Sequence, residues 1–137
     1  MNTNKLAIGA LLGFVVYFLG GFLFYTIVFK DIMASSNPGM AGTQRDPDMA
    51  AIVIGNLAAA FLLAYIFEKW ASIRTWMSGA VAGATIGGLY GLAYDSLIHG
   101  TSNLMTWKGV LADVIVYALL SALAGAVIGW YLGYKRK

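Results

Sequence analysis

Four long apolar stretches limit the folds open to this chain more than any other feature of its sequence. They cover residues 6–29, 49–67, 76–98 and 110–134. Within them the only charged residues are Asp95 and Asp113. A hydrocarbon core of about 30 Å needs about 20 helical residues, so each stretch is long enough to cross it. Lipid cannot satisfy backbone polar groups, so stretches of this length predict helices rather than the shorter strands of a barrel. The sequence therefore predicts an all-α membrane protein, with four transmembrane helices in a single integral membrane domain over residues 1–137.

The composition agrees with a lipid solvent. Hydrophobic residues make up 60% of the 137 residues and charged residues 11%, whereas soluble domains carry about 25% charged residues. A chain of this length cannot hide so much apolar surface in a core of its own, so the expected partner is the lipid bilayer. The net charge of +3 is too small to indicate a nucleic-acid partner, and the absence of cysteine excludes disulfides and thiolate metal sites.

The distribution of basic residues predicts the orientation. The two chain ends and the connection between the second and third stretches carry Lys5, Lys69, Arg74, Lys135, Arg136 and Lys137. The outer loop 30–48 and the last connection carry Lys30, Arg45 and Lys108. Because Lys and Arg gather on the cytoplasmic side of membrane proteins, we expect a multi-pass protein with both termini in the cytoplasm. The first stretch is longer than the apolar region of a signal peptide, so we expect it to be retained as a helix.

A four-residue spacing of small residues recurs in the third and fourth stretches. These residues are Gly79, Gly83, Gly87 and Gly91 in the third stretch, and Gly125 and Gly129 in the fourth. Residues four apart form a ridge along one face of a helix. Small residues on such a ridge let two backbones approach closely, which is how membrane helices associate. The spacing predicts that these glycines pack the two antiparallel helices tightly against each other.

Polar side chains gather near the connection between the same two helices: Asp95, His99, Asp113 and Tyr117. The antiparallel arrangement puts Asp95 and Asp113 level with each other, roughly 4–5 Å inside the outer boundary at 1.5 Å per residue. The helix dipole favours the charge of Asp113 near a helix start and disfavours that of Asp95 near a helix end. His99 follows Asp95 by four residues on roughly the same face and is expected to pair with it.

This polar cluster has two interpretations. Ionisable residues inside a membrane are functional candidates, so the cluster could bind a proton or cation from the outer side. Alternatively, the acids are shallow enough to be solvated and serve only to fix the two helices in register. A lone histidine with two carboxylates matches no metal-ligand spacing, and no catalytic constellation is present, so we expect no metal, no cofactor and no enzyme activity.

The ends of the first and last stretches carry a resemblance to a known family. The first stretch ends in Leu23-Phe24-Tyr25-Thr26, followed by Phe29-Lys30, and the last contains Asp113 and the pair Gly125-Ala126. These residues resemble a family of small, uncharacterised bacterial inner-membrane proteins with a domain of unknown function. That family has a Leu-Trp-Tyr-Ser-like motif and a Phe-Gly-Lys turn at these places, so Phe here replaces the Trp and the Gly is missing. The resemblance implies four helices in an inner membrane and supplies no activity.

The sequence leaves two functions open. One is an oligomeric channel or secondary transporter for a proton, a cation or a small solute, in which a pore would need two or more copies because four short helices enclose little volume. The other is a non-catalytic accessory or scaffold protein that docks another membrane protein, or itself, through its glycine-rich helix faces.

Overall fold

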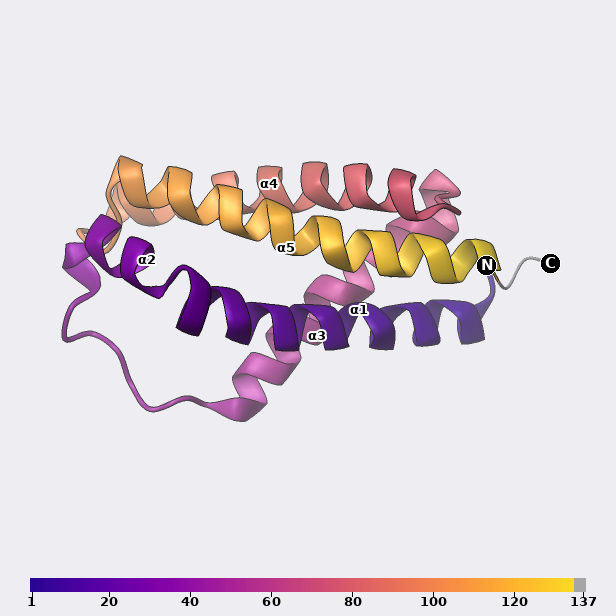
Figure 1. Cartoon of the computed structure of the whole chain (residues 1–137), viewed down its shortest axis with the longest axis horizontal. Coiled ribbons are helices and arrows are strands. Elements are labelled where there is room, and N and C mark those ends of the chain that lie inside the picture. Colours follow the sequence, from indigo (N-terminus) through magenta and orange to yellow (C-terminus); the bar gives the residue numbers. More distant parts are fainter. Residues whose placement is uncertain (135–137) are drawn as a thin grey trace.

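The computed structural model describes residues 1–134. The α-helices of this part are α1 (Thr3–Leu23), α2 (Lys30–Ser36), α3 (Met49–Tyr65), α4 (Trp76–Thr101) and α5 (Trp107–Tyr134) (Figure 1). Shorter helical turns are η1 (Phe24–Val28), η2 (Pro38–Met40) and η3 (Ile66–Ala71). The turns η1 and η3 are π-helical and continue α1 and α3 without a break. Residues 1–134 contain no strand, so the predicted all-α class is confirmed.

The predicted number of four helices is wrong, because the described chain contains five α-helices. The additional helix, α2, is the first part of the segment 30–48, which the sequence predicted to be an outer connector. The Thr106 hydroxyl donates a hydrogen bond of 2.6 Å to the Ser36 carbonyl and ties the end of α2 to the start of α5. After η2 the segment continues as a loop to the start of α3 (Figure 1). There the Asp48 carboxylate caps α3 by accepting a hydrogen bond of 3.1 Å from the Ala51 amide.

Three helical segments, rather than the predicted four, are both long and apolar enough to cross a membrane. They are Thr3–Val28, Met49–Ala71 and Trp107–Tyr134. The helix α4 has 26 residues and is long enough, but its many Gly, Ser and Thr residues make it less apolar than the others. The glycines among these small residues let α4 pack closely against α5.

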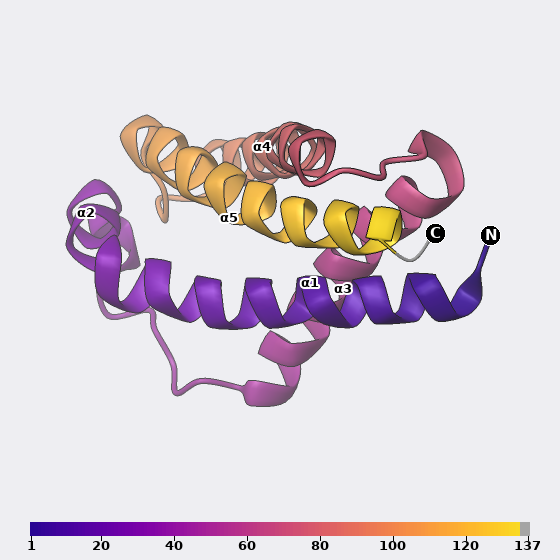
Figure 2. The same ribbon diagram turned by 45° about the vertical axis from the view of Figure 1, so that its right-hand side comes forward.

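The helices α4 and α5 form the most extensive helix pair and lie side by side along their lengths (Figures 1 and 2). A Cβ atom added to Gly79 would meet the carbonyl oxygen of Gly125, and one added to Gly125 would meet the carbonyl oxygen of Gly79. A Cβ atom at Gly83 would meet the carbonyl oxygen of Ser121. The two backbones are thus in direct contact, and only glycine fits at these positions.

The contact loosens towards the end of the bundle where α2 lies, which we call the α2 end. At the far end of the pair a Cβ atom at Gly129 would meet the carbonyl oxygen of Thr75, the residue that caps the start of α4. Towards the α2 end a Cβ atom at Gly87 would still meet the Ser121 side chain. At Gly91, by contrast, it would lie 3.6 Å from the Tyr117 ring, an ordinary contact. The space between the helices therefore widens at the α2 end.

The opposite end of the bundle is closed by apolar side chains. The helix α1 packs on α3 and α5, and α3 runs across the bundle rather than along it (Figures 1 and 2). The fully buried side chains here are Leu63, Phe67, Ile128 and Leu132. Gly13 of α1 leaves room for the Ile128 side chain, which a Cβ atom at that position would meet.

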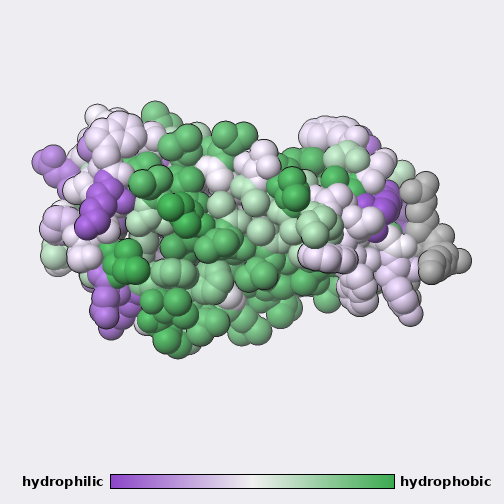
Figure 3. Space-filling model, turned by 45° about the horizontal axis from the view of Figure 1, so that its top comes forward, coloured by the Kyte–Doolittle hydropathy of each residue, from purple (hydrophilic) through white to green (hydrophobic). Residues whose placement is uncertain are grey.

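The surface of the molecule suits a lipid environment. On the face shown in Figure 3, hydrophobic side chains form a broad band across the middle, and hydrophilic residues gather at the two ends. On α5 the exposed side chains include Leu111, Ile115, Leu119 and Leu123, which share one face of the helix. Exposed apolar surface of this extent marks a membrane or protein contact, because soluble monomers rarely tolerate it.

The start of α1 and the end of α5 lie at the same end of the bundle (Figure 1). The C-terminal basic residues that enter the orientation prediction, Lys135, Arg136 and Lys137, lie outside the described residues. The side of the membrane on which the termini lie therefore stays a prediction.

Candidate functional site

A cavity of about 760 Å³ opens at the α2 end of the bundle. Its walls come from η1, α2, η2, α4 and α5, so segments distant in the sequence meet around it. Its polar lining residues include Tyr25, Lys30, Gln44, Asp95 and Asp113. The cavity thus contains both acids that the sequence analysis singled out.

Asp95 is the most buried ionisable residue of this cavity. Its side chain is only 3% exposed, and its Oδ2 atom has no hydrogen-bond partner within residues 1–134. On α4 it continues the buried row that includes Gly87 and Gly91 at four-residue spacing. The glycines of this row let α4 and α5 contact each other directly. Asp95 is the next residue of the row, and its carboxyl group lies in the wider space between the two helices.

Asp113 faces the same cavity from α5 and has a partner. The Tyr25 hydroxyl donates a hydrogen bond of 2.7 Å to Asp113 Oδ1. Tyr25 belongs to η1, a π-helical turn, and such turns often occur at functional sites because the extra residue changes the direction of the side chains that follow. The carboxyl groups of Asp95 and Asp113 are neighbours.

The structure does not bring His99 to Asp95, so the expected pairing of these two residues is not formed. The His99 Nδ1 atom lies 2.8 Å from the Met105 carbonyl oxygen, which only accepts, so Nδ1 carries the proton and donates. The ring centroids of His99 and Trp107 are 4.5 Å apart. Within residues 1–134 the one ion pair joins Arg74 to Glu68, at the opposite end of the bundle. Asp95 is therefore left without a cationic partner from the described chain.

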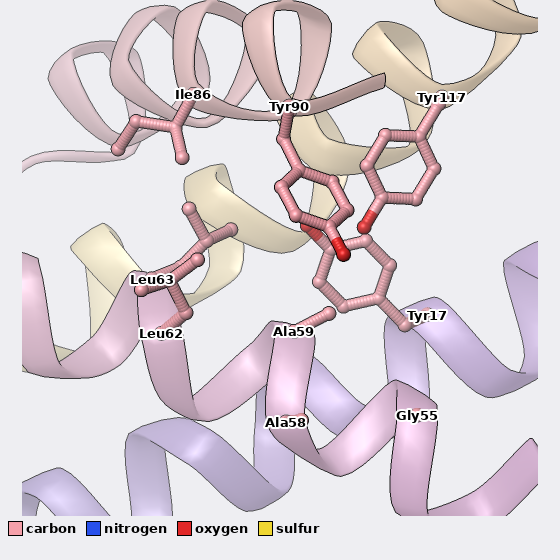
Figure 4. Close-up of a pocket in the computed structure, with 10 residues that line it drawn as sticks. Tyr17, Gly55, Ala58, Ala59, Leu62, Leu63, Ile86, Tyr90 and Tyr117 are labelled. Atoms are coloured by element: carbon pink, nitrogen blue, oxygen red, sulfur yellow. The ribbon is translucent and has the colours of Figure 1, made fainter. Parts of the chain in front are cut away.

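Tyr117 belongs to a second, smaller hollow of about 290 Å³ between α3 and α4 (Figure 4). Its ring stacks on Tyr17, with the centroids 6.0 Å apart, and lies 6.3 Å from the ring of Tyr90. The buried Tyr17 hydroxyl donates a hydrogen bond of 2.8 Å to the Ser121 hydroxyl. The side chains of Tyr17, Tyr90 and Tyr117 come together at this hollow (Figure 4). The predicted cluster is therefore divided, because Asp95 and Asp113 line the larger cavity and Tyr117 does not.

The segment 30–40, which contains α2 and η2 and lines the larger cavity, packs against the turn between α4 and α5. A Cβ atom at Gly39 would meet the backbone carbonyl of Asn103, and one at Gly109 would meet the Asn37 side chain. With the bond from Thr106 to the α2 carbonyl, these close approaches hold α2 and η2 against the turn, and residues of both line the cavity. Asn37-Pro38-Gly39 is a turn-forming sequence, but nothing in it indicates this docking.

The sequence analysis also missed the role of Tyr25. The row Tyr17, Gly21 and Tyr25 has the same four-residue spacing as the glycine rows. This spacing was a signal that Tyr25 shares an interior face of the first helix, but the residue that it meets lies on α5 and cannot be read from spacing.

No protein-family model, no curated protein and no solved structure matches this chain. The resemblance to a bacterial inner-membrane family stays a prediction, and the function has to be inferred from the cavity.

Proposed function

We propose that this chain is a multi-pass membrane protein that binds a proton or a cation in the larger cavity, from the outer side, and acts as a channel or secondary transporter. The observation that carries the proposal is the buried Asp95 Oδ2 atom without a hydrogen-bond partner, in a cavity shared with Asp113. Ionisable residues within membrane segments mark ion and substrate pathways.

The energetics of the two acids support this proposal. Burying a carboxylate without a partner costs several kcal/mol. A second carboxylate beside it adds repulsion when both are ionised. A proton or cation held between Asp95 and Asp113 removes both penalties.

The packing of α4 supports four membrane crossings despite its lower hydropathy. It lies along α5 over the length of that helix, and α5 is one of the three segments apolar enough to cross. Its polar row faces α5 rather than lipid, since Gly79, Gly83 and Asp95 are buried. Four crossings place both termini on one side, and the basic residues make that side the cytoplasm, of an inner membrane if the bacterial resemblance holds.

The apolar end of the bundle bears on the oligomeric state. Leu63, Phe67 and Ile128 are buried apolar side chains that fill the half of the described bundle opposite the cavity and would bar a polar path there. Transport therefore requires a path between copies or a second conformation. We favour a homo-oligomer, because a bundle this small encloses little volume besides the cavity.

The scaffold alternative has less support. The glycine faces that would dock another protein, Gly79, Gly83 and Gly125, already contact each other inside the chain. They are not free to receive a partner helix. Catalysis is not part of the proposal either, since the polar groups around the cavity form no set of nucleophile, base and orienting group.

Flux through liposomes tests the proposal. The purified chain is reconstituted with a pH-sensitive dye inside, and a pH gradient or a Na⁺ or K⁺ gradient is imposed. We expect dye signals that exceed those of protein-free liposomes for at least one gradient. If no gradient produces a flux above the protein-free level, the transport proposal is wrong and the scaffold function takes its place.

A further inference from the structure

We infer that the larger cavity takes an organic monocation, an ammonium group on an apolar body, rather than a bare inorganic ion. This inference rests on the proposed function and specifies its substrate class. It follows from the size, the charge and the walls of the cavity.

The size of the cavity fits an organic molecule. Its volume of about 760 Å³ lies within the range of about 300–1,000 Å³ that is typical of small-molecule sites. A dehydrated metal ion fills only a small part of such a volume. Within residues 1–134 there is also no cluster of three or more His, Cys, Asp or Glu side chains that would bind a metal.

The charge of the cavity fits a single positive charge. Two carboxyl groups, of Asp95 and Asp113, and one ammonium group, of Lys30, line it. Two carboxylates against one ammonium leave an excess of one negative charge, which a monocation neutralises and a dication exceeds. His99 does not line this cavity, and its Nδ1 atom donates to the Met105 carbonyl rather than to either acid.

The hydrogen-bonding capacity of the cavity fits a donor. The free Oδ2 atom of Asp95 accepts hydrogen bonds only, when ionised, and an ammonium group donates up to three. A hydrogen bond between an ammonium and a carboxylate is among the strongest in proteins. An N–H donor at this depth therefore satisfies Asp95 Oδ2, which, with Asn37 Oδ1, is one of two buried cavity-lining side-chain atoms without a hydrogen-bond partner within residues 1–134.

The walls of the cavity fit an apolar body attached to that ammonium. Three of the six methionines in the chain, Met33, Met40 and Met105, line the cavity from three different segments. Flexible thioether side chains adapt to apolar ligands of different shapes. Tyr25 and Tyr94 add aromatic rings, whose faces attract cations.

Calorimetry on the full chain in lipid nanodiscs tests this inference, with benzylammonium as the probe and benzyl alcohol as its neutral counterpart. We expect benzylammonium to bind and benzyl alcohol to bind at least about tenfold more weakly. The variant Asp95→Asn should weaken benzylammonium binding by about thirtyfold, because it removes a buried charge partner. The matched control Asp46→Asn removes an exposed outer acid that does not line the cavity, and should leave binding unchanged.

A second variant guards against loss of folding. Asp95→Glu keeps the carboxylate and should retain more binding than Asp95→Asn, with size-exclusion profiles confirming that both remain folded. Equal binding of benzyl alcohol, or amine binding that Asp95→Asn does not weaken, would overturn the inference.

Na⁺ and Ag⁺ as further probes separate this inference from the proposed function. Na⁺ binding that requires Asp95, without any amine binding, would keep the proposed function and overturn the organic substrate class. Ag⁺ binding that Met40→Leu removes and Asp95→Asn does not would identify a thioether metal site and overturn it as well. If none of the probes binds and no proton flux is observed, the inference and the proposed function both fail.

Discussion

Replacing Gly83 by alanine should lower the free energy of unfolding by about 2 kcal/mol, the magnitude typical of overpacking. The new Cβ atom would meet the backbone carbonyl of Ser121, which cannot move aside as a side chain can. Relief requires α4 and α5 to separate, and that separation also breaks the contact between Gly79 and Gly125. Gly125→Ala should have an effect of similar size for the same reason. Reversible unfolding in mixed detergent micelles measures the change.

Gly88, another glycine of α4, provides the matched control. A Cβ atom at Gly88 would lie 3.5 Å from the Ala118 side chain, an ordinary contact. Gly88→Ala should therefore be neutral or stabilising, since alanine has the higher helix propensity by about 1 kcal/mol. If Gly83→Ala and Gly125→Ala both unfold like the parent chain, the two backbones are not in contact and the helix pairing is wrong.

The substitution Asp95→Asn should abolish the proton or cation flux while leaving the chain folded. Asparagine has nearly the same shape but cannot carry the negative charge that holds a cation or take up a proton. No N–H or O–H group within residues 1–134 donates to the buried Oδ2 atom, so the change breaks no hydrogen bond at that atom. Flux into liposomes measures the loss, and unfolding in detergent checks that stability is retained.

Asparagine substitutions at two other acids test whether the loss of flux is specific to Asp95 or follows from any loss of negative charge. Asp113→Asn should reduce stability more than Asp95→Asn does, because the hydrogen bond that Tyr25 donates to Asp113 is weaker to a neutral amide oxygen than to a carboxylate. Asp46→Asn, in the exposed segment before α3, should leave the flux unchanged. If Asp95→Asn and Asp113→Asn both transport like the parent chain, the acids only support the structure.

The helical class and the starts of α3 and α4 could be predicted because they depend on local patterns. Long uncharged stretches leave no alternative to helices in lipid. Asp48 before an apolar run is a helix-start pattern, and its carboxylate caps α3. The spacing of Gly79, Gly83 and Gly87 showed which face of α4 carries small residues, and this face is buried against α5. In each case the decisive residues are neighbours in the sequence or lie one helical turn apart.

The features that could not be predicted depend on contacts between distant segments. The helix α2 is ordered in part by docking on the turn after α4, through Thr106 and Gly39. Tyr25 reaches Asp113 by way of a π-helical turn, whose extra residue a regular helical period does not include. His99 was expected to pair with the nearest acid on its helix, but the Met105 carbonyl in the following turn is its partner. Sequence spacing carries no information about these tertiary partners.

The central claim is that a negatively charged cavity containing Asp95 opens on the outer side. The chain has no cysteine, so a single Ile98→Cys substitution places one thiol in the wall of this cavity without removing either acid. Membrane-impermeant methanethiosulfonate reagents are added to right-side-out and to inverted vesicles. The trimethylammonium reagent should label the thiol from the outer side only and faster than the sulfonate reagent, and Asp95→Asn should reduce that preference. Labelling from the cytoplasmic side alone, or equal rates for the two reagents in the presence of Asp95, would contradict the account.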